Sequence, residues 1–472
     1  MGARATLVAV AQTDRARIEL ERRLGPSKVL TSPEACATYA TDDSDVPGRT
    51  PDAVVVAASA QDVAVTLEVA ERFEVPVTPR AGGTGRTGGA IPVDGGIVLA
   101  THGLAKIKEI DRANLVAVVE PGVITGVLHA AVEAEGLFYA PDPNSLESCM
   151  IGGNLAENAG GPRVFKYGAT RDWVLGLEAC LMGGRVVRTG KRTVKGVTGY
   201  DVTSLLVGSE GTLAVFTEAT LRLVPKPAAI ATALALFSDV RGAARAVSAI
   251  VAAGVVPRCL EMLDSATLGA VRAAGVAIDP RAGAMLLIEV DGESSESSLM
   301  RVGEVATSCE GCFDVVVAQD AAQRDRLWAA RRMLSRAIRK LSRHKLSEDI
   351  VVPRTRISDL LDRTDDIGRK TGVRNLAYGH AGDGNLHVNF LWDDDSERPA
   401  VERAIGLLMQ ATVEMGGTLS GEHGIGVSKA QYLPLEQSEG LIALQRDVKR
   451  AFDPKGLLNP GKIFPSGGHR AC

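Results

Sequence analysis

Short apolar runs alternate with amphipathic periods along the chain. Apolar residues that recur every three or four positions predict helices, and short β-branched runs predict strands. Before Pro225 this pattern predicts a charged helix over 1–25, helices over 61–73 and 125–135, and strands over 53–57, 75–79, 96–100, 116–120 and 212–224.

A second rhythm begins after Pro225-Lys226-Pro227, which reads as a domain boundary. Strands are predicted over 233–237, 258–263, 284–290 and 313–318, and helices over 240–253, 295–307 and 321–340. This order favours an α+β domain whose helices cover one face of an antiparallel sheet. A chain of 472 residues also exceeds one ordinary core, so two domains are expected.

Composition narrows the functional classes. The net charge of −4 does not indicate the basic surface that proteins use to bind nucleic acid or an anionic membrane. No signal peptide and no apolar run of membrane-spanning length is visible. The seven scattered cysteines form no disulfide framework, so a cytoplasmic protein is expected. Cys309 and Cys312 form a C-x-x-C motif, interpreted as packing or chance rather than as a metal or redox pair.

Glycine is clustered in a few segments, of which the first directly follows a predicted strand. The first, 79–89, can turn several backbone N–H groups toward one anion. It matches neither a P-loop nor a helix-opening G-x-G-x-x-G. Similar small-residue segments lie at 141–145 with 151–161, at 198–201 and at 208–213. Four such segments predict a long ligand wrapped by backbone.

The order and spacing of these segments resemble the FAD-binding domain of the vanillyl-alcohol oxidase / p-cresol methylhydroxylase superfamily, despite Ala81 and Arg86 where a glycine and an apolar residue are common. The resemblance implies an FAD domain over 1–226, a substrate and metal-binding cap domain over 227–440, and a returning segment over 441–472. No histidine lies between Arg80 and Gly89, so non-covalent FAD is expected. The implied cofactor residues are Pro79, Arg80, Ala81, Gly82, Gly83, Thr84, Gly85, Gly88, Gly89, Pro141, Asp142, Ser145, Gly152, Gly153, Asn154, Glu157, Asn158, Gly160, Gly161, Glu210, Gly211, Leu213, Asn459 and Lys462.

Histidines and carboxylates gather in two later motifs. The run 380–389 reads H-A-G-D-G-N-L-H-V-N, and 420–426 reads S-G-E-H-G-I-G. Two histidines and a carboxylate form a reasonable first shell for Zn²⁺ or Mn²⁺ with positions open for substrate. The flanking glycines serve no helix or strand, which favours a functional site over isolated structural histidines.

These two motifs resemble the flavin-linked D-2-hydroxy acid dehydrogenases, which include D-lactate and D-2-hydroxyglutarate dehydrogenases and the flavin subunit of glycolate oxidase. The resemblance implies the metal ligands His380, His387 and Glu422, substrate contact by Asn389, and His423 as general base. Leu327–Arg331 resembles the family's Trp-x-x-Arg, whose arginine binds the substrate carboxylate. Ser335, one turn from Arg331, would add a hydroxyl donor, and Lys345 is a weaker second cation. The alternative interpretation of this helix is an exposed basic face.

In the implied reaction, His423 removes the hydroxyl proton while the Cα hydride passes to flavin N5, which yields the 2-keto acid. No nicotinamide or iron–sulfur motif is visible, so the electrons go to an external quinone, cytochrome, electron-transfer flavoprotein or iron–sulfur subunit. Two alternatives stay open: a redox-neutral transferase like the alkyl-dihydroxyacetone-phosphate synthases, and a flavin subunit that works only within a complex. A homodimer is possible, and the hydroxy acid is not specified.

Overall fold

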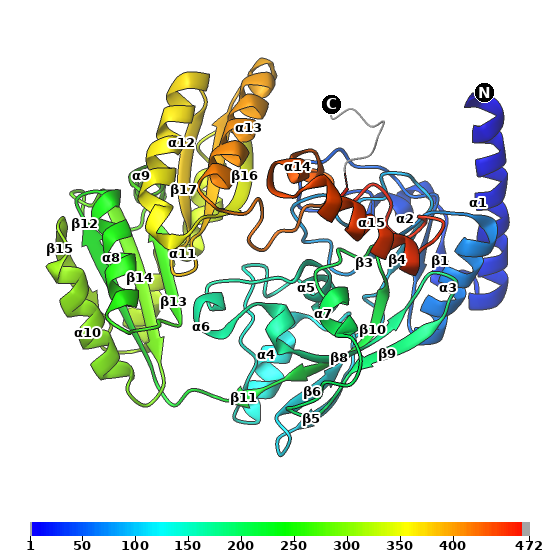
Figure 1. Ribbon diagram of the computed structural model, residues 1–472, viewed down its shortest axis with the longest axis horizontal. Helices are drawn as coiled ribbons and strands as arrows, with labels where there is room; N and C mark the ends of the chain where they lie inside the picture. Colours follow the sequence, from blue (N-terminus) through cyan, green and yellow to red (C-terminus); the bar gives the residue numbers. More distant parts are fainter. Residues whose placement is uncertain (1, 465–472) are drawn as a thin grey trace. The chain divides into compact units, whose positions relative to one another are not determined.

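Two units organise the chain in the computed structural model, which describes residues 2–464, with side chains from residue 11 onward. Unit 1 comprises residues 1–160, 169–226 and 422–472, and unit 2 comprises 161–168 and 227–421. The chain thus leaves and re-enters unit 1 twice (Figure 1).

Unit 1 contains a four-stranded sheet, order β1-β2-β4-β3, a five-stranded antiparallel sheet, order β5-β6-β10-β8-β9, and the pair β11-β7. In the first sheet β2, β4 and β3 are parallel. The strands are β1 (Val29–Leu30), β2 (Ala53–Val56), β3 (Val77–Arg80), β4 (Ile97–Ala100), β5 (Ile107–Asp111), β6 (Val116–Val119), β7 (Leu137–Phe138), β8 (Val174–Cys180), β9 (Val186–Gly190), β10 (Val215–Arg222) and β11 (Val224–Pro225).

Two helices of unit 1 pack against the parallel strands. Ser59 caps the N-terminus of α3 by accepting a hydrogen bond from the Asp62 N–H, and Val63 and Leu67 of that helix pack in one core with Leu20 of α1. The helices are α1 (Gly2–Leu24), α2 (Pro33–Ala37), α3 (Ala60–Phe73), α4 (Thr125–Ala134), α5 (Ile151–Glu157), α7 (Val202–Leu206), α14 (Leu433–Glu436) and α15 (Glu439–Phe452), with short 3₁₀ turns at Pro26–Lys28, Thr170–Trp173 and Ala430–Tyr432.

Unit 2 is built on a seven-stranded sheet, order β15-β12-β14-β13-β17-β18-β16, in which every pair is antiparallel. Its strands are β12 (Ile230–Phe237), β13 (Cys259–Leu263), β14 (Ala284–Asp291), β15 (Cys312–Val317), β16 (His344–Val351), β17 (Arg374–His380) and β18 (Asn385–Trp392). Its helices are α6 (Val164–Tyr167), α8 (Val240–Ala252), α9 (Ser265–Ala273), α10 (Ser295–Ser308), α11 (Ala321–Arg339), α12 (Ile357–Thr371) and α13 (Arg398–Glu414), with 3₁₀ turns at Arg354–Arg356 and Asp395–Glu397.

The two faces of this sheet carry different helices. Leu334 of α11 and Leu268 of α9 pack in one core with Leu236 of β12. Gly242 of α8 instead lies against Phe237, the next residue along β12, whose side chain points to the opposite face. Helices therefore cover both faces of the sheet, and the expectation of a single covered face was wrong. The order of strands and helices in the sequence predicts that helices pack on the sheet. It does not predict the face on which each helix lies.

The unit boundaries differ from the ranges expected from the sequence at two places. Residues 161–168 belong to unit 2, because Lys166 forms an ion pair with Asp291 of β14 and the Tyr167 hydroxyl donates to the same carboxylate at 2.7 Å. Unit 1 resumes at Glu422 rather than at residue 441. Within the described residues, no helix is long and apolar enough to cross a membrane. Residues 465–472 of the expected returning segment lie outside the described part of the chain.

Candidate functional site

The glycine loop after β3 meets the segment that opens α5. A Cβ added at Gly82 would lie 2.8 Å from the Ser148 carbonyl oxygen, so only glycine permits this approach of the two backbones. Gly153, in the first turn of α5, lies over the Ala81 methyl group. Two of the segments expected to hold FAD, far apart in the sequence, are therefore neighbours in unit 1.

The C-terminal segment completes this cluster. The Asn459 side-chain amide donates to the carbonyl oxygens of Gly89 at 3.1 Å and Glu210 at 2.7 Å, so it joins the first loop to the 208–213 segment. The Lys462 ammonium donates to the Ile91 carbonyl oxygen at 2.8 Å, and burial lowers the pKa of this group to about 8. Asn459 therefore contacts the end of the first glycine loop, and Lys462 contacts the chain two residues beyond it.

The Glu210 carboxylate fixes the turn that follows His423. It accepts hydrogen bonds from the backbone N–H groups of Ile425 at 2.8 Å and Gly426 at 2.7 Å. Burial raises the pKa of Glu210 in spite of these bonds. The pKa of Glu157 is raised well above its usual value, first by burial and then by the neighbouring Glu210 carboxylate. The Glu210 charge thus makes ionisation of Glu157 less favourable.

The remaining FAD candidates belong to the same unit, apart from Gly161, which is grouped with unit 2. Asn154 donates to the Thr125 hydroxyl at 2.6 Å, and the Pro141 carbonyl oxygen lies 2.9 Å from Nε2 of His129. Asn158 ends α5 in a left-handed conformation, with φ of 54°. In the 198–201 segment, by contrast, Tyr200 is 98% exposed, so this segment does not join the cluster.

In unit 2, a buried carboxylate joins two of the predicted site residues. Glu261 of β13 accepts from Nε of Arg331 at 2.6 Å with one oxygen and contacts Nδ1 of His380 at 2.5 Å with the other. Its side chain is 0% exposed. Burial alone would raise the pKa of Glu261, but the interactions with His380 and Arg331 lower it to about 2. The carboxylate is therefore ionised and binds two cationic or donor groups at once.

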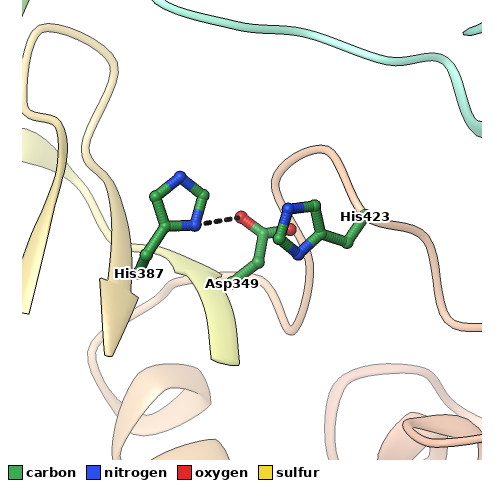
Figure 2. A group of neighbouring side chains, drawn as sticks. All are labelled: Asp349, His387 and His423. Atoms are coloured by element: carbon green, nitrogen blue, oxygen red, sulfur yellow. Dashed lines mark ion pairs between the residues drawn. The ribbon is translucent and has the colours of Figure 1, made fainter. Parts of the chain in front are cut away.

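Asp349 is a second buried carboxylate, and it lies next to His387. Figure 2 shows Asp349 of β16 facing the His387 ring, with Nδ1 and the carboxylate oxygen 4.0 Å apart. The other Asp349 oxygen accepts from the Ser420 hydroxyl and the Gly421 N–H, each at 2.9 Å. Asp349 thus lies beside one predicted ligand and fixes the chain immediately before Glu422. His423, also labelled in Figure 2, belongs to unit 1.

The two histidines are neighbours on one face of the sheet. His380 and His387 have ring centroids 5.3 Å apart at an interplanar angle of 87°. Asn389 follows on the same face of β18. Its amide donates to the His387 carbonyl oxygen at 2.9 Å, and its Oδ1 is buried with no hydrogen-bond partner among the described residues. A buried acceptor in this state costs about 1–3 kcal/mol, which a bound hydroxyl or amine donor would recover.

Arg331 is buried in α11, not part of a solvated helix face. Its residue is only 7% exposed, and its guanidinium lies over the Tyr378 ring, 5.2 Å from the ring centroid. Ser335 and Arg332 on the same helix are exposed. Lys345 lies on β16, on the strand face that also carries Asp349, and is partly buried. Arg331, and not Ser335, is therefore the α11 side chain grouped with the two histidines.

Sequence reasoning missed Glu261 and Asp349. A signal was present for each: Glu261 is the only charged residue in the strand 259–263, which reads C-L-E-M-L, and Asp349 lies in 347–352, S-E-D-I-V-V, beside a hydrophobic run. A carboxylate in a strand that is otherwise buried requires a partner, because unpaired burial is costly. The identity of that partner is not visible in the local pattern.

Two family models match the chain: an FAD binding domain over residues 51–190, and the C-terminal domain of FAD linked oxidases over residues 226–463. The chain is 40% identical to the glycolate oxidase subunit GlcD of Bacillus subtilis (strain 168), covering 93% of this chain and 94% of that protein. It is 32% identical to a D-lactate dehydrogenase of Anaerostipes hadrus (94% and 96%) and 31% identical to a D-2-hydroxyglutarate dehydrogenase of Stutzerimonas stutzeri (96% and 99%).

Solved structures agree on the fold. p-Cresol methylhydroxylase matches with a TM-score of 0.79 at 18% identity, covering 96% of this chain and 97% of that one. An alkyldihydroxyacetonephosphate synthase matches with a TM-score of 0.75 at 20% identity, covering 94% and 85%. The expected two-domain flavoprotein fold with FAD as cofactor is confirmed. With the full-length relatives and both domain models in agreement, this chain belongs to the FAD-linked oxidase family.

Proposed function

We propose that this protein oxidises a D-2-hydroxy acid, of the D-lactate, D-2-hydroxyglutarate or glycolate type, to the 2-keto acid. The observation that carries the proposal is one buried sheet face that holds a guanidinium and two imidazoles, Arg331 beside His380 and His387. Such a face offers a cation for a carboxylate and nitrogen ligands for a metal that would bind an adjacent hydroxyl. Relatives that match over nearly their whole length are named for these substrates.

A divalent metal fits the donor set. Both histidines turn Nδ1 toward a buried carboxylate, Glu261 for His380 and Asp349 for His387, which directs Nε2 to the opposite side of each ring. His380 makes the second hydrogen bond that histidine ligands of metals generally make, and at His387 the carboxylate lies at ion-pair distance. Glu422 directly follows Gly421, whose N–H donates to Asp349. The Cα atoms of Gly421 and Glu422 are about 3.8 Å apart, because the two residues share a peptide bond. We assign His380, His387 and Glu422 as the ligands of Zn²⁺ or Mn²⁺.

In this assignment the protein's residues hold the substrate and move one proton. The terminal nitrogens of Arg331 bind the substrate carboxylate, since Nε is engaged by Glu261, and Asn389 Oδ1 accepts from the substrate hydroxyl or its bound water. His423 removes the hydroxyl proton as Cα is oxidised. A divalent cation supplies Lewis acidity at the hydroxyl, and FAD supplies the electron-accepting chemistry.

The direct test is anaerobic mixing of the purified protein with D- and L-lactate, glycolate and D-2-hydroxyglutarate. Bleaching of the flavin absorbance by one of these acids, followed by reduction of an artificial dye, is the expected result. A redox-neutral transferase would leave the flavin oxidised with all of them. That outcome would contradict the proposed oxidation.

The acceptor of the electrons is proposed to be another protein or a quinone. The glycolate oxidase relatives are named as subunits, which supports an external protein partner. An electron-transfer flavoprotein, a cytochrome or an iron–sulfur subunit would serve. Full turnover of the isolated chain with dye, and slow turnover with oxygen, would support this assignment.

FAD is expected to be bound without a covalent bond. No histidine lies in the loop from Arg80 to Gly89, so this loop offers no imidazole for a covalent link to the flavin. Acid precipitation of the yellow protein should release all of the FAD into the supernatant. Flavin that stays on the washed pellet would contradict the prediction.

Metal removal is expected to abolish most turnover and to leave the FAD in place. The reason is that the proposed histidine ligands belong to unit 2, whereas the glycine loops belong to unit 1. Chelator-treated protein should keep its flavin absorbance, lose most dye reduction, and regain it with Zn²⁺ or Mn²⁺. Full activity after metal analysis has verified removal would exclude the metal role.

A further inference from the structure

Glu261 occupies an unusual position between two groups of the proposed site. Each of its carboxylate oxygens has its own partner: Oε2 accepts from Nε of Arg331 at 2.6 Å, and Oε1 lies 2.5 Å from Nδ1 of His380. Glu261 and His380 are directly paired across β13 and β17. The strand register therefore brings together two residues that are 119 positions apart in the sequence.

The bond to His380 selects which ring nitrogen faces the metal. With Nδ1–H donating to a carboxylate, the lone pair lies on Nε2, and the ring cannot rotate without breaking the bond. An ionised partner also makes the imidazole a stronger donor to a cation. Glu261 thus determines the tautomer and the orientation of one proposed ligand.

The bond to Arg331 determines which edge of the guanidinium meets the substrate. Nε is turned toward Glu261, and the planar group lies over the Tyr378 ring. The carboxylate of the substrate must then meet the terminal nitrogens. A guanidinium with two fixed contacts loses little freedom on binding, which favours bidentate recognition.

We propose that Glu261 is a positioning residue that couples the metal ligand His380 to the substrate-binding Arg331; this inference rests on the proposed function. A buried ion pair contributes little to stability compared with apolar packing of the same volume. The carboxylate at this place is therefore explained by orientation of two functional groups, not by stability of the sheet.

A matched control lies on the neighbouring strand. Glu289 of β14 is also buried and ion-paired, with Nε of Arg258 at 3.1 Å, and accepts from the Trp328 indole N–H at 3.0 Å. Its other described partner is the Thr232 hydroxyl, so none of the groups that bind it is a proposed metal ligand or Arg331. Glu261→Gln and Glu289→Gln thus remove one buried charge each from the same sheet, and a purely structural role predicts the same phenotype for both.

The experiment measures Zn²⁺ affinity by competition with a chromogenic chelator, together with kcat and KM in dye reduction, on the full-length flavoprotein. Glu261→Gln keeps one acceptor oxygen but presents an amide N–H₂ to the other partner. We expect its Zn²⁺ affinity to fall by about 10- to 100-fold and its KM to rise. Glu289→Gln should lose thermal stability but keep both values.

Glu261→Asp provides a second variant if Glu261→Gln folds poorly. It keeps the charge but retracts the carboxylate by one methylene, so a smaller loss of Zn²⁺ affinity in the same direction is expected. Wild-type affinity and KM in the Glu261 variants, in a protein that does bind Zn²⁺, would overturn this inference and leave the proposed function standing. A wild-type protein that binds neither Zn²⁺ nor Mn²⁺ would overturn the metal assignment and this inference with it.

Discussion

Arg331→Ala should lower kcat/KM for the hydroxy acid by about 10²-fold or more, since roughly 1.4 kcal/mol corresponds to each factor of ten. The guanidinium is expected to bind the substrate carboxylate in a desolvated site, where loss of one partner is expensive. The melting temperature should fall as well, contrary to expectation for a residue on a solvated helix face. Arg331 is paired with the fully buried Glu261, and breaking such a pair costs about 3–5 kcal/mol.

Two further variants separate binding from stability. Arg331→Lys keeps a positive charge beside Glu261 but loses the planar fork, so stability should stay near wild type while kcat/KM stays low. Arg332→Ala is the control, because this exposed neighbour is turned about 100° away on α11. Wild-type kcat/KM in the lysine variant would contradict the assignment and make Lys345 the next candidate.

His423→Asn should lower kcat by about 10²- to 10⁴-fold, the usual contribution of a positioned general base. FAD content should not change. The chain at this point is fixed through backbone groups: the Thr87 hydroxyl donates to the His423 carbonyl oxygen at 3.1 Å, and Glu210 binds the N–H groups of Ile425 and Gly426. The turn after His423 also requires glycine, since Gly424 has a φ of +78° and Glu157 lies against it.

His344→Gln is the matched control for this prediction. His344 lies on β16, stacked on Trp392 with ring centroids 5.2 Å apart, and has no role in the proposed reaction. Dye-reduction kinetics and flavin absorbance of both variants provide the measurement. If His423→Asn retained wild-type kcat with full FAD content, another group would have to remove the hydroxyl proton.

The sequence by itself determined the bounds of many secondary-structure elements before residue 340. The strand predicted over 284–290 is β14 (Ala284–Asp291), and the helix predicted over 321–340 is α11 (Ala321–Arg339). Periodicity reports burial along one element, and these elements are strongly periodic. The sequence also indicated the FAD-binding domain. Where two backbones approach closely, as at Gly82, only glycine fits, so the glycines appear as short clusters in the sequence.

Tertiary structure alone decided which buried groups meet. Strand register places Glu261 beside His380, and helix packing brings Arg331 to the same carboxylate. The tertiary structure also places residues 161–168 in unit 2, where Lys166 forms an ion pair with Asp291. Contacts of this kind depend on which strands pair and which face each helix covers. A local hydrophobic pattern carries no information about either, because burial alone does not specify the partner.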